Sequence, residues 1–128
     1  MTLTEFLLAR IAEDEAKARA AAAKYAEDGS APAWSRRHWE RRLHAGPTAT
    51  FVMAHSPARV LAECEAKRGI VEECQMLIES FGDWDATPGA PIIWLGVGRR
   101  ERSQAHGRLR ALASVYADHP DCHDEWKP

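Results

Sequence analysis

The stretch that decides the fold is SPARVLAECEAKRGIVEECQMLIESF, residues 56–81. Ser56 has the side chain of a helix N-cap, and Pro57 fits the first helical position, where a missing N–H costs nothing. Apolar side chains then recur at the spacing of one helix face. They are Val60, Cys64, Val71, Cys74 and Ile78, widened by Leu61, Ile70, Leu77 and Phe81 and interrupted only by Lys67. The pattern predicts a helix with Leu61, Val71 and Ile78 buried and with Glu65 and Glu72 in solvent.

Two further helices are predicted, one on each side of this stretch. The first covers roughly residues 3–27, with Thr2 or Thr4 as a cap and an alanine run at 20–23 that has very high helix propensity. Its apolar face contains Leu7, Ile11, Ala18, Ala22 and Tyr25. The second covers about residues 100–116, and the side chains expected to face inward are Leu109, Leu112, Ala113, Val115 and Tyr116.

The segments between these helices carry turn and strand signals. Gly29 and Pro32 should end the first helix. The secondary structure of residues 34–47 is left open. The β-branched and large side chains of 48–53 favour a short strand or an extended segment. Residues 82–98 predict a loop in which 92–95 could form a second short strand. Residues 118–121 predict a turn, followed by one helical turn ending at Trp126. We therefore expect a mainly α, compact single domain over residues 1–128, with three main helices, an irregular middle and one or two short β-strands at most.

Composition narrows the class of protein. The chain has 128 residues, of which 45% are hydrophobic and 28% are charged, close to the averages of globular domains. An apolar run without a charged residue, 86–98, contains prolines and glycines and is shorter than the ~18 residues that span a bilayer. We expect a soluble protein with no membrane partner. A charged N-terminal segment and three cysteines, an odd number, favour reduced thiols and the cytoplasm.

Two segments carry a resemblance. They are AHSPARVLAECEAKR at 54–68 and LASVYADHPDCHDEW at 112–126. Together they resemble a family of small uncharacterised proteins, a domain of unknown function, from actinobacteria and their phages. The resemblance implies no activity. Ser56 stands where an aspartate is commoner, which keeps the capping chemistry, and Cys122 stands where an aromatic is commoner, which argues against an inherited ligand role for this thiol.

The formal net charge of −2 conceals two basic blocks separated by acidic segments. Arginines beside aromatic rings can neutralise phosphates while the rings stack on bases, and Trp34 and Trp39 flank the first block. The sequence pI of about 6.3 and the lack of a recognition motif favour pairing with the acidic segments instead. The candidate binding residues in these blocks are Arg36, Arg37, Arg41, Arg42, Arg99, Arg100 and Arg102.

The ending of the chain offers donor atoms for a metal. His119, Cys122 and His123 lie within five residues of one another, but zinc needs about four ligands and no Cys-x-x-Cys pair supplies the rest. For Cys64 and Cys74, a role as small apolar residues of the buried stripe is a simpler interpretation than metal binding. No nucleophile, base and orienting group can be named together, so we predict no catalytic residue and no cofactor.

Trp126 is a large apolar residue near the end of the chain, where chains usually fray. We expect it to dock near Tyr116; the rival is an exposed anchor that fills a pocket on a partner. The function favoured overall is a non-catalytic protein-interaction module that binds a protein partner or a second copy. The alternatives are an arginine-mediated nucleic-acid-binding protein and a metal-binding or hydrolytic protein that uses the histidines and cysteine of its C-terminus.

Overall fold

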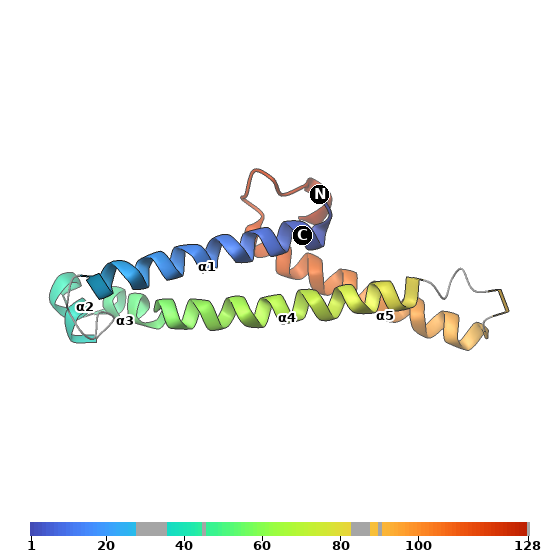
Figure 1. Ribbon diagram of the computed structural model, residues 1–128, viewed down its shortest axis with the longest axis horizontal. Coiled ribbons are helices and arrows are strands. Elements are labelled where there is room, and N and C mark those ends of the chain that lie inside the picture. The colour runs from blue at the N-terminus through green and yellow to red at the C-terminus, as the bar shows by residue number, and fades with distance from the viewer. Residues whose placement is uncertain (28–35, 45, 83–87, 90, 128) are drawn as a thin grey trace. The chain divides into compact units, whose positions relative to one another are not determined.

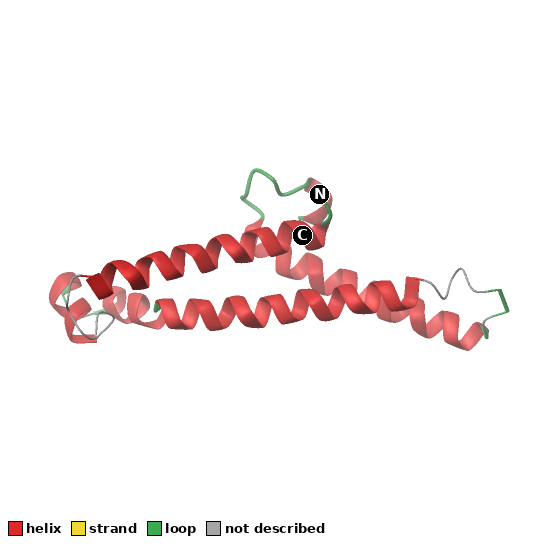
Figure 2. Cartoon of the chain, in the orientation of Figure 1, coloured by secondary structure: helices red, strands yellow, loops and turns green. Residues whose placement is uncertain are grey.

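The computed structural model describes residues 1–27, 36–44, 46–82, 88–89 and 91–127, and it is all α there (Figures 1 and 2). In chain order the elements are α1 (Leu3–Glu27), α2 (Arg36–Leu43), α3 (Pro47–Ala54), α4 (Pro57–Gly82), α5 (Ile92–Ala113) and the 3₁₀ turns η2 (Ser114–Tyr116) and η3 (Asp124–Trp126). The mainly α prediction with three main helices is confirmed. No strand occurs among the residues just given.

A capping box starts α1. The Thr2 hydroxyl accepts a hydrogen bond from the backbone N–H of Glu5 at 3.2 Å, and the Glu5 carboxylate accepts one from the N–H of Thr2 at 2.7 Å. Thr2 is therefore the cap, and Thr4 instead donates to Gln75. Three of the predicted inward residues are buried, Leu7, Ile11 and Ala18. Ala22 is exposed, so its predicted inward position is wrong. The Tyr25 side chain and the predicted stop at 28–32 lie outside the described residues.

The decisive stretch forms α4 as predicted. The Ser56 hydroxyl accepts a hydrogen bond from the N–H of Arg59 at 3.3 Å, which caps the helix. Cys64, Val71 and Cys74 are buried, and Glu65 and Glu72 are exposed, as expected. Leu61 and Ile78 are only half-buried, and Ile70 is exposed. The buried stripe of α4 is thus narrower than predicted, because Leu61 and Ile78 lie at its edge and Ile70 lies outside it.

Residues 48–53 are helical, which corrects the predicted strand. Gly46 is the N-cap of α3 and Pro47 stands in its first turn. Both the backbone N–H and the hydroxyl of Thr50 donate to the Gly46 carbonyl, at 3.1 and 3.2 Å. The preference of β-branched residues for strands is weak and depends on a neighbouring strand, whereas a proline and a capping carbonyl start a helix locally.

Residues 92–95 are helical too, so the second predicted strand is also wrong. The N–H groups of Trp94 and Leu95 donate to the Pro91 carbonyl at 2.9 and 3.1 Å and open the first turn of α5. Residues 92–98 therefore belong to the last helix and not to the predicted loop, and this helix begins eight positions before residue 100. Val115 is 63% exposed instead of buried, because α5 gives way to the tighter η2 turn at Ser114 and the register of its inward face changes there.

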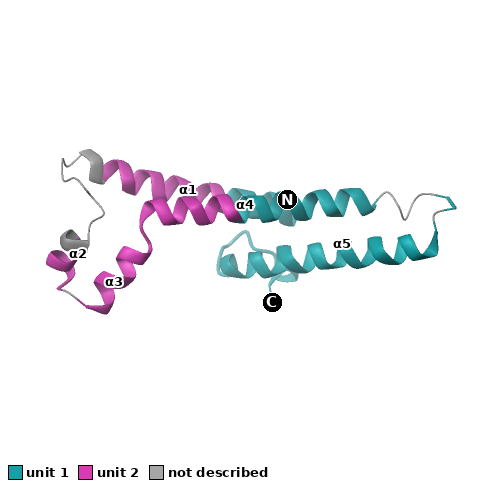
Figure 3. Cartoon of the chain, turned by 90° about the horizontal axis from the view of Figure 1, so that it is seen from below, with its two compact units in different colours: residues 1–10, 67–128 teal, residues 11–66 magenta. Residues whose placement is uncertain are grey.

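The chain divides into two compact units (Figure 3). Unit 1 contains residues 1–10 and 67–128, and unit 2 contains residues 11–66. In unit 1 the later part of α4 and the whole of α5 run antiparallel, and Gly98 permits their close approach: a Cβ at this position would lie 3.1 Å from Cδ1 of Phe81. The other buried residues of α5 are Ala105, Leu109 and Ala113. None of the described helices is long and apolar enough to cross a membrane.

Candidate functional site

The tail of unit 1 closes over the first turns of α1. Phe6 is fully buried, and its ring centroid lies 5.2 Å from that of Trp126 and 6.4 Å from that of Tyr116. Trp126 is 7% exposed, so the predicted docking near Tyr116 is confirmed, with Phe6 as the ring between them. Trp126 is therefore a core residue and not an exposed anchor.

A buried arginine lies beside these rings. The Arg10 side chain is 8% exposed, and its Nη1 is 2.7 Å from Nδ1 of His119 and 3.4 Å from Oδ2 of Asp121. The backbone N–H of Asp121 also donates to Nδ1 of His119, at 3.1 Å. Nη1 of Arg10 also contacts Nε2 of the same ring, so the guanidinium lies against the imidazole through both of its nitrogens. This contact uses His119 to hold the turn at 118–121 against α1.

Lys67 was the only polar residue within the predicted apolar stripe of α4. Its Nζ donates to the Tyr116 hydroxyl at 3.5 Å and lies 5.5 Å from the centre of that ring. The long aliphatic part of the side chain can stay among apolar neighbours while the ammonium reaches a polar partner. The interruption therefore serves the packing of the tail.

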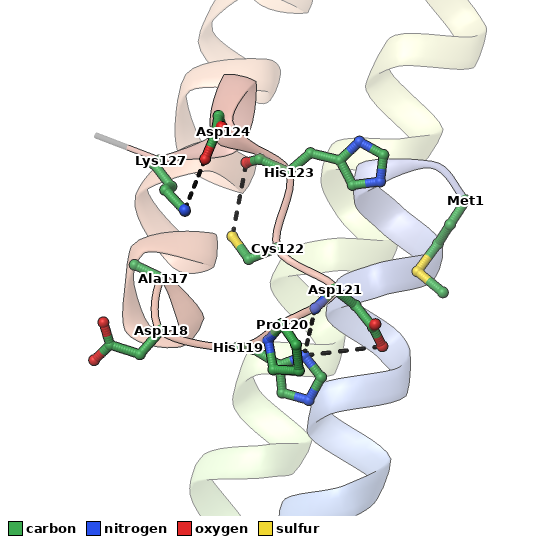
Figure 4. Close-up of a pocket in the computed structure, with 10 residues that line it drawn as sticks. All are labelled: Met1, Ala117, Asp118, His119, Pro120, Asp121, Cys122, His123, Asp124 and Lys127. Carbon is green, nitrogen blue, oxygen red and sulfur yellow. Dashed lines mark hydrogen bonds and ion pairs between the residues drawn. The ribbon is translucent and has the colours of Figure 1, made fainter.

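A polar hollow of about 860 Å³ opens beside the tail, lined by Met1, residues 117–124 and Lys127 (Figure 4). Its residues include the predicted metal candidates, but their side chains have other roles. Cys122 is buried and its Sγ donates to the His123 carbonyl at 3.9 Å, while the His123 ring stacks on Trp126 with centroids 4.2 Å apart. Within the described residues, no group of three or more His, Cys, Asp or Glu side chains could hold a metal ion.

Charges in this hollow partly neutralise one another. Nζ of Lys127 donates to Oδ1 of Asp124 at 2.7 Å. The hydrogen bond from Lys127 lowers the pKa of Asp124, and the hydrogen bond to Asp124 raises the pKa of Lys127. The His119 ring contacts Arg10. The hollow therefore offers neither a nucleophile paired with a base nor a converging set of donors for catalysis.

The second hollow of unit 1 is basic. It measures about 550 Å³ and is lined entirely by α5, through Arg99, Arg102, Ser103, His106, Gly107 and Arg110. Two of the predicted binding arginines, Arg99 and Arg102, thus line one site, and Arg100 is exposed but outside its lining. Arg110 and His106 complete the site. Gly107 and Ser103 leave the space between the longer side chains.

The start of α5 exposes a cluster of large apolar side chains. Ile92 is 87% exposed, Ile93 79%, Trp94 57% and Val97 51%. On a helix, Ile92 shares one face with Gly96, Arg99, Ser103, His106 and Arg110, because these positions recur at steps of four and three residues. We call this set the α5 docking face. An exposed apolar cluster beside polar residues is typical of an interaction surface.

The first arginine block belongs to unit 2. Arg41 and Arg42 are exposed in the last turn of α2. Arg36 and Arg37 lie in the first turn of the same helix, and their side chains, with Trp34, fall outside the described residues. The two blocks therefore belong to different units, each of which has its own basic surface.

Sequence reasoning missed Phe6, Arg10 and His106. Phe6 and Arg10 had a signal: they lie one position before and three positions after Leu7, at the edges of the predicted apolar face of the first helix. Arginine is rarely buried, so the charge of Arg10 argued against a position in the core. No sequence signal indicated His106 apart from its position in the second basic block.

The cysteines of α4 belong to the core. Cys64 and Cys74 are each 1% exposed, and burial raises the pKa of the Cys74 thiol. Neither cysteine is in a disulfide. These properties suit small apolar core residues and not nucleophiles, which need an accessible thiolate.

Comparison with known proteins gives a family and no function. No curated protein and no solved structure matches the chain. The profile of one protein family does match, and it covers residues 1–128, which include both segments singled out in the sequence. The chain therefore belongs to the family of unknown function DUF6221.

Proposed function

We propose that this protein is a non-catalytic protein-interaction module and that it contacts its partner through the α5 docking face. The observation that carries the proposal is the pairing, on one helix, of an apolar start with a basic hollow. Protein partners commonly fill such a surface with an apolar anchor and acidic side chains.

The apolar residues give the proposal its strength. Ile92 is more exposed than any other large apolar side chain among the described residues, and Ile93 follows it. Burying an isoleucine side chain contributes roughly 1.5–3 kcal/mol, so leaving Ile92 of the docking face in water is a cost that a partner could remove. The C-terminal tail, by contrast, is already occupied, because Trp126 is packed against Phe6.

Photo-crosslinking in cells tests this proposal. A benzoyl-phenylalanine in place of Ser103, inside the basic hollow, should give protein adducts, whereas the same residue in place of the exposed Ala12 on α1 should not. The adducts should survive nuclease treatment and disappear when Arg99→Glu and Arg110→Glu are added. Adducts that are absent from position 103, or that persist after both reversals, would contradict the proposal.

The alternative is binding of nucleic acid. It is supported by the arginines of the hollow and by Trp94, which is 57% exposed five residues before Arg99. Trp94 lies on the opposite flank of the helix from the hollow, so one strand could not engage both in the way that stacking sites do. A gel shift with single-stranded and duplex oligonucleotides separates the two proposals: binding that weakens steeply with salt would favour nucleic acid.

Our proposal includes a setting. The resemblance of residues 54–68 and 112–126 to proteins of actinobacteria and their phages supports an origin in that group. The three buried cysteines, none of them in a disulfide, support a reducing cytoplasm. Fractionation of a tagged protein in its host tests the location.

A further inference from the structure

We infer that the partner of the α5 docking face is a second copy of this chain, which presents the exposed acidic face of α4. We define the α4 acidic face as Glu72, Met76 and Glu79. This inference rests on the proposed function, because it names the occupant of the same surface.

The two faces have matching spacing. Glu72, Met76 and Glu79 follow one another at steps of four and three residues, the same steps that relate the residues of the α5 docking face. Helices with this spacing pack side by side at a shallow angle. All three α4 residues are exposed, and Met76 is 59% exposed on the side of the helix away from the buried Cys74.

The two faces also have opposite charge. Arg99 and Arg110 make the α5 docking face positive, whereas Glu72 and Glu79 make the α4 acidic face negative. The Glu79 carboxylate is already oriented, because Nε2 of Gln75 donates to it at 2.6 Å. Opposite charges across an interface favour encounter and select the partner.

Charge decides which helices can meet. Packing α5 on α5 would oppose Arg99 and Arg110 of two copies, and packing α4 on α4 would oppose their glutamates. Like charges brought face to face are unfavourable, so α5 of one copy must meet α4 of the other. Met76 lies between the two glutamates and supplies an apolar side chain to that contact, and methionine adapts its shape to its neighbours.

Such a contact is heterologous, since it joins two different faces. After the first contact one copy keeps its α4 acidic face unused and the other keeps its α5 docking face unused, so assembly continues until a ring closes or a chain forms. The average mass should therefore rise with concentration beyond that of a dimer. It should fall with added salt, because exposed charges are screened over about 8 Å at physiological ionic strength.

Charge-reversal variants of the full chain test this inference, with mass measured by sedimentation velocity after nuclease treatment. Arg99→Glu with Arg110→Glu should abolish self-association, and so should Glu72→Lys with Glu79→Lys, each weakening it on the order of tenfold or more. Mixing the two variants should restore association, because each supplies the face that the other lacks. Arg41→Glu with Arg42→Glu makes the same change of charge on exposed arginines of α2 and should leave association unchanged.

Circular dichroism confirms that each variant is folded; a pair that unfolds is replaced by glutamine at the same positions, which should weaken association without reversing charge. A wild-type chain that stays monomeric up to hundreds of micromolar would overturn the inference, and so would association that the mixture fails to restore. Loss of the wild-type assembly after nuclease treatment would overturn it in favour of bridging nucleic acid. Monomeric protein that still gives adducts with other proteins from position 103 would leave the proposed function standing, whereas absence of both would remove the two together.

Discussion

The closed end of unit 1 and the outer side of α5 show opposite uses of large side chains. At the closed end, Phe6 and Trp126 are buried against each other, and the charged Arg10 is buried with partners from the tail. On α5, Ile92 and Ile93 are more than three-quarters exposed beside arginines. A residue's chemistry alone therefore does not show its role: an arginine belongs to the core at one end, and two isoleucines belong to the surface at the other.

The difference separates stability from binding. The closed end joins segments far apart in the sequence, so its contacts must be formed for unit 1 to fold. The residues of the α5 docking face are exposed, so we expect substitutions there to leave the protein folded. The predictions below test this separation, beginning with the largest expected effect.

The aromatic contact at the closed end should dominate stability. Trp126→Ala should lower the free energy of unfolding by about 3–5 kcal/mol, because a large buried ring is lost and a cavity is left. Truncation after Ala117 should be at least as damaging. Denaturant titration followed by circular dichroism measures both. Unchanged midpoints would mean that the tail does not stabilise the fold and would return Trp126 to the role of an exposed anchor.

Val71 should show a smaller effect of the same kind. It is fully buried on α4, and Val71→Ala should cost on the order of 1–3 kcal/mol from lost burial and a small cavity. Glu65→Ala, on the exposed side of the same helix, is the matched control and should change stability by less than about 0.5 kcal/mol. Equal effects of the two substitutions would contradict the narrow buried stripe of α4.

The capping box of α1 should make stability depend on pH in the acid range. Hydrogen bonds from the backbone N–H and hydroxyl of Thr2 lower the pKa of Glu5 in the folded chain. The contribution of Glu5 is therefore complete above the unfolded-state pKa of about 4.3 and is lost as pH falls through the lower folded value. Glu5→Gln should reduce this acid dependence in thermal melts recorded from pH 7 to pH 3. A variant with the wild-type profile would show that the cap contributes nothing through its charge.

The apolar start of α5 should contribute least to stability. Ile93→Ser should change the free energy of unfolding by less than about 0.5 kcal/mol, because the side chain is 79% exposed. Thermal melts at low concentration check this. A loss comparable to that of Val71→Ala would show that Ile93 packs within its own chain and would remove the distinction between the two regions.

The sequence was most informative where local chemistry decides structure. Ser56 and Pro57 start α4 as predicted, and Thr2, one of the two predicted caps, starts α1; both helix starts were predicted from side chains within four residues. The docking of Trp126 was predicted from a general cost: a terminal segment orders only if its ring is buried. Arg99 and Arg102 were found as part of a charge block, which needs no tertiary information.

The errors arose where tertiary packing or weak propensities decide. Residues 48–53 and 92–95 are rich in β-branched and aromatic side chains, but each segment follows a proline at a helix start. The Gly46 carbonyl accepts the first hydrogen bond of α3, and the Pro91 carbonyl accepts those of α5. The sequence predicts a loop at Gly98, because its contact with Phe81 depends on tertiary packing and leaves no local signal. The partners of Arg10 lie more than 100 positions away in the sequence, so its burial could not be predicted from its neighbours.

Hydrogen exchange measured by mass spectrometry at two protein concentrations tests the separation of stability from binding most directly. At high concentration, peptides that cover residues 72–79 and 92–110 should become more protected, because the α4 acidic face and the α5 docking face meet between copies. Peptides that cover residues 118–127 should be equally protected at both concentrations, because Trp126 is packed within its own chain. Protection of the tail that rises with concentration, while α5 stays unchanged, would contradict the account.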